Sequence, residues 1–130
     1  MACAAAPIIR TAGDAARLFR SRVGRQEREA LLVAHLDGKR RLLNLSEEAI
    51  GGVGHVVVPV RAIVADALRL DSAGLILAHC HPSGDPEPSE ADIAATRRLS
   101  EMGAQLGLSL YDHLIFAAGQ CRSFRALGLL

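Results

Sequence analysis

A short apolar run meets a rigid, proline-rich segment near the middle of the sequence. Residues 74–78 read GLILA, which favours a buried strand, and the next residues read HCHP. Three prolines and a glycine within residues 82–88 exclude both helix and strand from the following segment. The sequence therefore predicts a strand that ends near His81 and a stiff loop after it.

The two histidines at this junction are predicted to lie on one face of the strand. Side chains alternate along a strand, so His79 and His81 point the same way and Cys80 points the other way. Two residues of strand rise put their Cα atoms roughly 6.7 Å apart. This spacing lets both imidazole rings converge on one ion.

A helix is predicted to begin directly after the loop. Ser89 and Asp92 have the spacing of an N-terminal capping pair, and residues from Ile93 onward recur at helical spacing. The loop can return this helix start to the end of the strand. His79, His81 and Asp92 would then offer three ligands to a zinc ion and leave the fourth position for water, as a catalytic zinc site requires.

Each part of this pattern has an ordinary explanation when it stands alone. Ser-x-x-Asp is a common helix cap, and an isolated His-x-His at a strand end is usually incidental. The combined order, His-x-His, seven residues and Ser-x-x-Asp, resembles the JAMM motif of JAB/MPN metalloproteases, and HCHPSGDPEPS resembles the RadC branch of that family closely. The similarity extends from Ala12 to Leu130, although Cys80 stands where RadC proteins usually have Asn.

The resemblance implies an α/β fold with a mixed, mostly antiparallel sheet flanked by helices, the MPN/JAB or cytidine deaminase-like sandwich. It also implies a zinc-dependent hydrolase that cleaves a peptide or isopeptide bond in a polypeptide substrate, with one Zn²⁺ per chain. The implied base is Glu29, and Glu27 is its rival because the sequence shows neither beside the histidines. Ser89 has two candidate roles, capping its helix and donating a hydrogen bond to the oxyanion of the reaction.

The rest of the chain is expected to form one domain. Its 130 residues, 50% of them hydrophobic, suffice for a single core over residues 11–130, with a flexible tail at residues 1–10. Before the strand that ends near His81, we expect a helix after Thr11, a hairpin turning at Asp37-Gly38 between strands at 29–37 and 40–45, a strand at 55–58 and a helix at 59–70. Toward the C-terminus, we expect strands at 106–111 and 114–118 separated by Asp112-His113, and a closing segment at 122–130.

Three further polar positions leave alternatives open. Asp85 can bind the ion or form an Asx turn in the loop. Asp112-His113 can support a metal ligand or complete a turn between strands. Cys80 is a poor candidate for a nucleophile, because its sulfur is predicted to lie on the strand face away from the histidines.

Composition limits the location and the partners that we expect. Three cysteines without paired spacing favour a reducing cytoplasm, and no apolar segment is long enough to span a membrane. The net charge of +1 supports nucleic-acid binding only weakly, although six arginines lie between residues 10 and 28. The alternatives to a hydrolase are a RadC-type DNA-repair-associated module that binds nucleic acid or protein partners, with the metal site secondary, and a non-catalytic MPN scaffold. The oligomeric state stays open, and a homodimer is one option.

Overall fold

A five-stranded sheet forms the centre of the computed structural model, which describes residues 6–23, 29–50, 58–81 and 84–130. Its order is β2-β1-β3-β4-β5, and only β3 and β4 run parallel among the neighbouring pairs. The expected mixed, mostly antiparallel sheet is therefore confirmed. The strands are β1 (Ala30–Leu36), β2 (Leu42–Ile50), β3 (Gly74–Cys80), β4 (Ser109–Ala117) and β5 (Gln120–Ser123).

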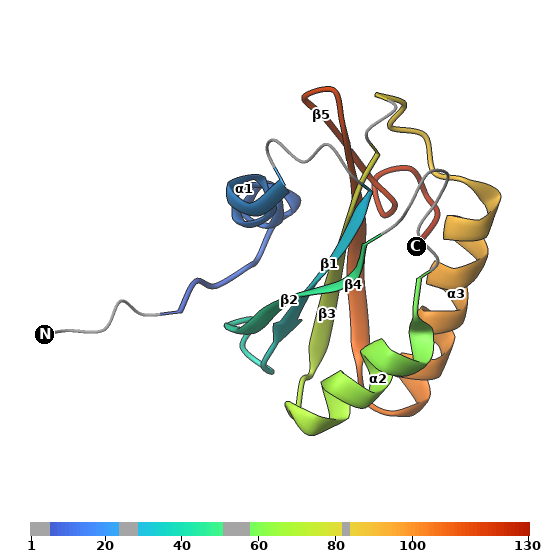
Figure 1. Cartoon of the computed structure of the whole chain (residues 1–130). Coiled ribbons are helices and arrows are strands. Elements are labelled where there is room, and N and C mark those ends of the chain that lie inside the picture. Colours follow the sequence, from blue (N-terminus) through green and yellow to red (C-terminus); the bar gives the residue numbers. More distant parts are fainter. Residues whose placement is uncertain (1–5, 24–28, 51–57, 82–83) are drawn as a thin grey trace, which may run out of the picture.

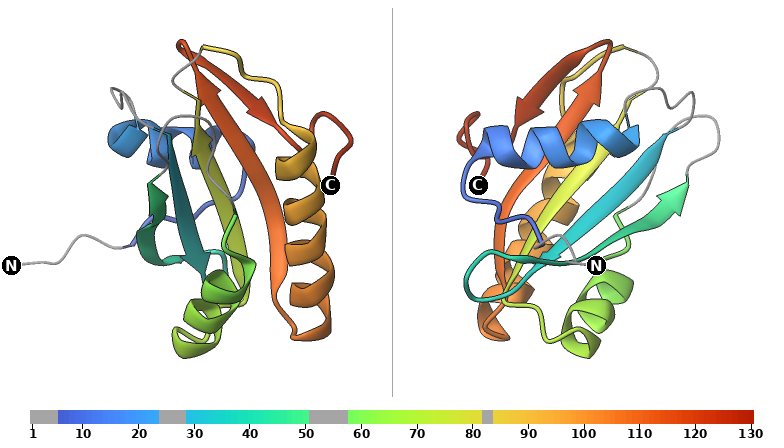
Figure 2. Two further views of the ribbon diagram at one scale, coloured as in Figure 1. Left: turned by 45° about the vertical axis from the view of Figure 1, so that its right-hand side comes forward. Right: turned by 90° about the vertical axis from the view of Figure 1, so that its left-hand side faces the viewer.

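Helices cover both faces of this sheet. Helix α1 (Ala12–Val23) lies on one face, and α2 (Val60–Arg69) and α3 (Glu90–Gln105) lie on the other (Figure 1). Figure 2 shows α1 crossing the strands and α3 running beside β4. Because neighbouring parallel strands need a crossover connection, α3 joins β3 to β4 and brings its own start back to the end of β3.

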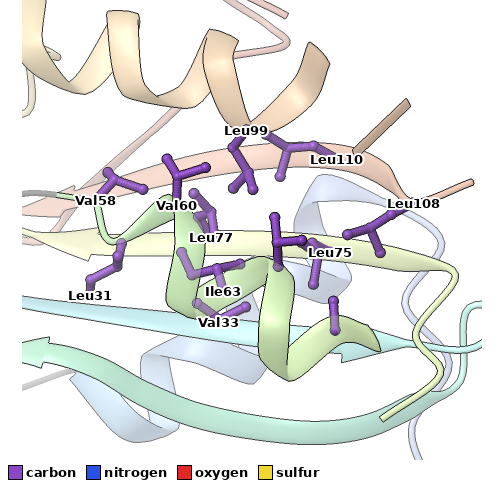
Figure 3. Close-up of a cluster of buried hydrophobic side chains, with 12 residues drawn as sticks. Leu31, Val33, Val58, Val60, Ile63, Leu75, Leu77, Leu99, Leu108 and Leu110 are labelled. Carbon is purple, nitrogen blue, oxygen red and sulfur yellow. The ribbon is translucent and has the colours of Figure 1, made fainter. Parts of the chain in front are cut away.

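The core on the α2 and α3 side is built from alternate residues of the strands. Leu31 and Val33 of β1 and Leu75 and Leu77 of β3 point into it, and Ile63 of α2 packs on them (Figure 3). These side chains are buried. The residues that continue the same alternation at the strand ends, before β1 and after β3, therefore also face the α3 side.

The opposite core lies under α1. Phe19 of α1 is fully buried and its ring lies 6.5 Å from that of Phe116 on β4. Thr11 caps the helix, because its hydroxyl accepts a hydrogen bond from the amide of Asp14 at 3.0 Å. The helix expected after Thr11 is confirmed, and it lies across the sheet (Figure 2).

The hairpin between β1 and β2 differs from the tight turn predicted at Asp37-Gly38. The Asp37 carboxylate accepts hydrogen bonds from the amides of Lys39 and Arg41, at 2.8 and 2.9 Å. Arg40, rather than the glycine, has a positive φ of 62°. The loop is thus longer than predicted, and β2 begins at Leu42 and continues to Ile50 instead of ending at residue 45.

The N-terminal segment pairs with this loop. The amide of Ile9 donates to the carbonyl of Arg40 at 2.9 Å, and that of Leu42 donates to the carbonyl of Pro7 at 2.9 Å. Ile9 is buried. Packed structure therefore includes residues inside the predicted tail at 1–10, of which residues 1–5 lie outside the described part. Most of the strand expected at 55–58 also lies outside it.

The prediction of two strands separated by Asp112-His113 is wrong. A single strand, β4, runs through both residues. Both are buried, and Asp112 is satisfied there, since its carboxylate accepts hydrogen bonds from the amides of His113 and Arg125 and from the Ser123 hydroxyl. A carboxylate with three donors can lie inside a strand, whereas sequence alone shows only a polar pair.

Candidate metal centre

The two histidines of the HCHP segment lie together at the end of β3. His79 is the second-last residue of β3, and His81 is the first residue after the strand. Their ring centroids are 4.5 Å apart, with the ring planes at 79°. The intervening Cys80 is paired with Phe116 of β4, which packs in the core under α1, so its side chain lies on the opposite face of the sheet. The predicted alternation is confirmed.

Glu29 joins the histidines because β1 is the antiparallel neighbour of β3. Ala30 is paired with Cys80 and Leu31 with His79, so the residue before β1 lies beside the end of β3. The Oε1 atom of Glu29 lies 3.5 Å from Nε2 of His79 and 4.0 Å from Nε2 of His81. Its side chain is nearly buried, with 11% of its surface exposed. The rival base, Glu27, lies outside the described residues.

The start of α3 supplies a second carboxylate. Ser89 and Asp92 form a reciprocal capping box: the Ser89 hydroxyl accepts a hydrogen bond from the Asp92 amide at 3.0 Å, and Oδ2 of Asp92 accepts one from the Ser89 amide at 3.2 Å. Asp92 is buried, and its Oδ1 lies 3.4 Å from Nδ1 of His79. Its Oδ2 lies 3.6 Å from Nε2 of His81. The cap therefore also orients Asp92 toward both imidazoles.

The proline-rich loop orients His81. Its Nδ1 lies 2.9 Å from the backbone carbonyl oxygen of Asp85, and a carbonyl can only accept, so Nδ1 carries the proton. The Nε2 lone pair then faces Glu29 and Asp92 and is available to a metal ion. The Asp85 carboxylate accepts a hydrogen bond from the Glu87 amide at 3.0 Å, which is the Asx turn offered as one of its two alternatives.

Several buried polar atoms of this cluster make no hydrogen bond. Among the described residues, Oε2 of Glu29 and both ring nitrogens of His79 lack a partner. An unsatisfied buried polar group costs about 1–3 kcal/mol. A cation bound between the imidazoles and the carboxylates would satisfy these atoms. Nitrogen and carboxylate oxygen are also the donor types of zinc sites. The residues present thus fit a metal ion.

Electrostatic interactions within the cluster keep the Asp92 carboxylate ionised. Burial opposes ionisation of Asp92, but the neighbouring imidazoles and the Ser89 hydroxyl hold the pKa of its carboxyl well below the usual range. The Asp92 carboxylate in turn raises the pKa of His81, against the effect of burial and with help from the Asp85 carbonyl. Asp92 is therefore ionised at neutral pH, as a metal ligand must be.

A stack of rings supports the cluster from the side of β4. His113 lies between His79, at 6.0 Å and 27°, and Phe124, at 4.4 Å and 18°. Nδ1 of His113 lies 2.8 Å from the hydroxyl of Thr96 on α3. Burial, with the nearby His79 as the next cause, lowers the pKa of His113 to about 3, so the ring is neutral. Neither Thr96 nor Phe124 was singled out from the sequence.

The thiol of Cys80 stays apart from this chemistry. Burial, with a smaller contribution from Glu29, raises the pKa of the Cys80 thiol. A raised pKa disfavours the thiolate, which is the nucleophilic form.

In the described part of the chain, one group of residues has its ligand atoms within 4.8 Å of one another: Glu29, His79 and His81. With Asp92, which contacts both histidines, these residues are called the candidate metal centre below.

Comparison with known proteins agrees with this geometry. The model of the RadC-like JAB domain family matches residues 9–129. This chain belongs to that family. It is 50% identical over 102 residues to a UPF0758 protein of Rhodobacter capsulatus, covering 78% of this chain and 48% of that protein. It is 43% identical over 105 residues to a UPF0758 protein of Methanospirillum hungatei, covering 81% and 47% of the two chains.

A more distant relative covers more of the sequence. A UPF0758 protein of Moorella thermoacetica is 37% identical over 123 residues, which are 95% of this RadC-like JAB chain and 54% of the relative. The chain thus spans about half the length of the curated relatives that it matches. Within the described residues of the RadC-like domain, no helix has the length and hydropathy that a membrane-spanning helix needs.

Proposed function

We propose that this domain is a zinc-dependent hydrolase that cleaves a peptide or isopeptide bond in a polypeptide substrate. The observation that carries the proposal is the environment of His79. This imidazole is buried, and neither of its nitrogens has a hydrogen-bond partner among the described residues. A carboxylate oxygen lies near each nitrogen, from Glu29 on one side and Asp92 on the other. Membership in the RadC-like JAB family supports the reaction class.

We assign His79, His81 and Asp92 as the zinc ligands. Asp92 is chosen over Glu29 because it contacts both imidazoles at 3.4 and 3.6 Å and is fixed by the capping box. When bound, zinc lowers the pKa of a water molecule and polarises a carbonyl group. Three protein ligands leave one position for that water.

Glu29 is assigned as the general base. Its Oε2 atom is buried and makes no hydrogen bond in the described part of the chain, so it has a lone pair for a proton. A carboxylate in this position can take a proton from water and pass it to the leaving amine. Ser89 lies at the exposed start of α3, and its hydroxyl proton is not used by the cap, in which the oxygen accepts. The hydroxyl can therefore donate a hydrogen bond to the oxyanion.

The test combines metal content with hydrolysis. Protein purified without added metal, stripped with a chelator and reloaded with zinc should cleave a library of peptides and of lysine-linked isopeptides only in the reloaded form. Glu29→Gln should retain zinc and lose about 100- to 10,000-fold in rate, as expected for a lost general base. Glu47→Gln, on the exposed face of β2, is the control and should be fully active.

Three outcomes contradict parts of the assignment. A wild-type protein that binds no zinc refutes the metal centre itself. A zinc-loaded protein that cleaves no member of either library refutes the hydrolase. If Glu29→Gln instead loses zinc, Glu29 is a ligand, as its grouping with His79 and His81 within 4.8 Å would also allow, and the base must be another group.

A further inference from the structure

A cavity lies on the α1 side of the sheet, away from the candidate metal centre. This cavity of about 500 Å³ is bounded by the segment before α1, the start of β4 and the turn after β5. Small-molecule sites typically have about 300–1,000 Å³. Ile9 and Ile76 give it an apolar wall, and Thr11 and Ser123 add hydroxyl groups. The cavity thus has the size and the mixed lining of a ligand site.

Three arginines line the cavity, and none forms a salt bridge with another residue that the structure describes. Arg10, Arg40 and Arg125 come from three segments that are distant in the sequence. The salt bridges of the described residues involve none of the three. The Arg40 guanidinium lies 4.3 Å from the centre of the Tyr111 ring and donates to the carbonyl of Arg10 at 3.2 Å. Arg125 donates from Nε to the carbonyl of Tyr111 at 2.7 Å.

After these contacts, the guanidinium groups of Arg40 and Arg125 still have N–H donors that could bind a ligand. A guanidinium has five N–H donors, and Arg40 and Arg125 use only some of theirs on backbone carbonyls. The side chain of Arg10 makes no hydrogen bond within the described residues, whereas its amide donates to Asp14. The backbone bonds and the ring contact hold two of the three groups in place. An ordered, positively charged lining is therefore present before any ligand arrives.

The one carboxylate in the lining does not cancel this charge. Asp112 is buried, and its oxygens already accept hydrogen bonds from the His113 amide at 2.8 Å, the Arg125 amide at 3.1 Å and the Ser123 hydroxyl at 2.5 Å. Asp112 thus joins β4 to residues 123–125 through hydrogen bonds and forms no salt bridge with a described guanidinium group. The described lining thus has three arginines and one carboxylate, which gives it an excess of positive charge.

We propose that this cavity binds a small organic anion. Its phosphate or carboxylate group would lie among the guanidinium groups of Arg10, Arg40 and Arg125, whose planar forks match such oxyanions. Its uncharged part would lie against Ile9 and Ile76. The site is separate from the candidate metal centre, because Ile76 belongs to the core under α1 whereas His79 faces α3. The proposal therefore does not rest on the proposed hydrolysis.

The test is a titration followed by NMR of the ¹⁵N-labelled chain. Inorganic phosphate and adenosine monophosphate are added at constant ionic strength, with sodium chloride as the reference. Saturable shifts are expected for amides of residues 9–15, 40 and 123–126. Arg10→Gln should weaken the binding of adenosine monophosphate about tenfold, because it removes one charged hydrogen-bonding group. Arg20→Gln, which removes the same charge from α1 outside the cavity, should leave the affinity unchanged.

The alternatives give different results. If neither phosphate nor adenosine monophosphate produces saturable shifts at the lining residues, the proposal is overturned. It is also overturned if Arg20→Gln weakens binding as much as Arg10→Gln does, because a diffuse basic surface would then explain the effect. In that case a short duplex DNA should bind with a steep dependence on salt, and the α1 face would be a surface for polyanions.

Discussion

The Nε2 atom of His79 lies 3.5 Å from Oε1 of Glu29, although the two residues are far apart in the sequence. The antiparallel pairing of β1 with β3 creates this contact. Asp92 lies on the other side of the same ring, at 3.4 Å from Nδ1. Because Glu29 and Asp92 lie at different nitrogens of this imidazole, mutation can separate the roles of the two acids.

Asp92→Asn should remove the metal ion and leave the fold intact. The amide side chain retains an oxygen for the Ser89 amide but loses the charge that attracts a cation. We expect zinc affinity to fall by more than about 100-fold, since even residues that only support ligands contribute about 10- to 100-fold. Competition with a chromophoric chelator measures the affinity. Glu90→Gln, at an exposed position in the same helical turn, is the control and should bind zinc normally.

Substitutions of Ser89 should separate capping from catalysis. Ser89→Ala removes both, so we expect a loss of about 1 kcal/mol in the free energy of unfolding and a loss of about 100- to 1,000-fold in kcat. Ser89→Asp keeps a capping acceptor but has no hydroxyl proton, so it should be stable and slow. Ser89→Thr should recover both properties. Full activity in stable Ser89→Asp protein would remove Ser89 from the mechanism.

The buried, neutral His113 should make the metal-free domain less stable in acid. Its pKa is lowered to about 3 by burial, so below its unfolded-state pKa of about 6.5 the unfolded chain binds a proton that the folded domain does not. The penalty is absent above pH 6.5 and grows as the pH falls toward 3. Between pH 7.5 and pH 5 it should reach about 2 kcal/mol.

Urea unfolding with a chelator present measures this pH dependence. His113→Phe should have a smaller decrease in the free energy of unfolding over the same pH range, whatever its stability at pH 7.5. His35→Phe is a matched comparison at a second buried histidine, whose pKa is also lowered by burial. An identical pH dependence in wild-type and His113→Phe protein would show that folding does not lower the pKa of His113.

Gly74→Ala should destabilise the domain through the Tyr111 ring. A Cβ atom at this position would lie 2.1 Å from Cε2 of Tyr111, so the ring would have to leave its place under Arg40. Overpacking of this kind typically costs about 1–3 kcal/mol. Gly38→Ala is the control, because no atom of the described residues lies within 4 Å of its added Cβ. Equal midpoints of urea unfolding for the two variants would contradict the close packing of Gly74 and Tyr111.

Local signals pointed to three of the four residues of the candidate metal centre. The alternation of a strand puts His79 and His81 on one face, and the Ser89–Asp92 spacing encodes the capping box that the structure contains. The adjacency of Glu29 has no local signal, because it depends on which strand lies beside β3. Only the family resemblance pointed to Glu29.

The two wrong predictions, of a turn at Asp112-His113 and of a short hairpin, arose from contacts that the sequence does not show. Asp112 and His113 look like turn residues because their partners, Ser123, Arg125 and Thr96, are not neighbours in the sequence. The hairpin looked shorter than it is because the Asp37 carboxylate and the paired N-terminal segment stabilise the extra loop residues. In β4, and where the N-terminal segment pairs with the hairpin, polar groups that seemed to require solvent are satisfied by distant parts of the chain.

The ring stack from Phe124 through His113 to His79 connects the turn after β5 with the candidate metal centre. Aromatic protons that lie over a neighbouring ring are sensitive to its tilt. The resonances of the Phe124 side chain should therefore move when an ion reorients His79, although Phe124 itself offers no ligand atom. A single labelled phenylalanine would then report metal loading, at equilibrium and in real time, without any substrate.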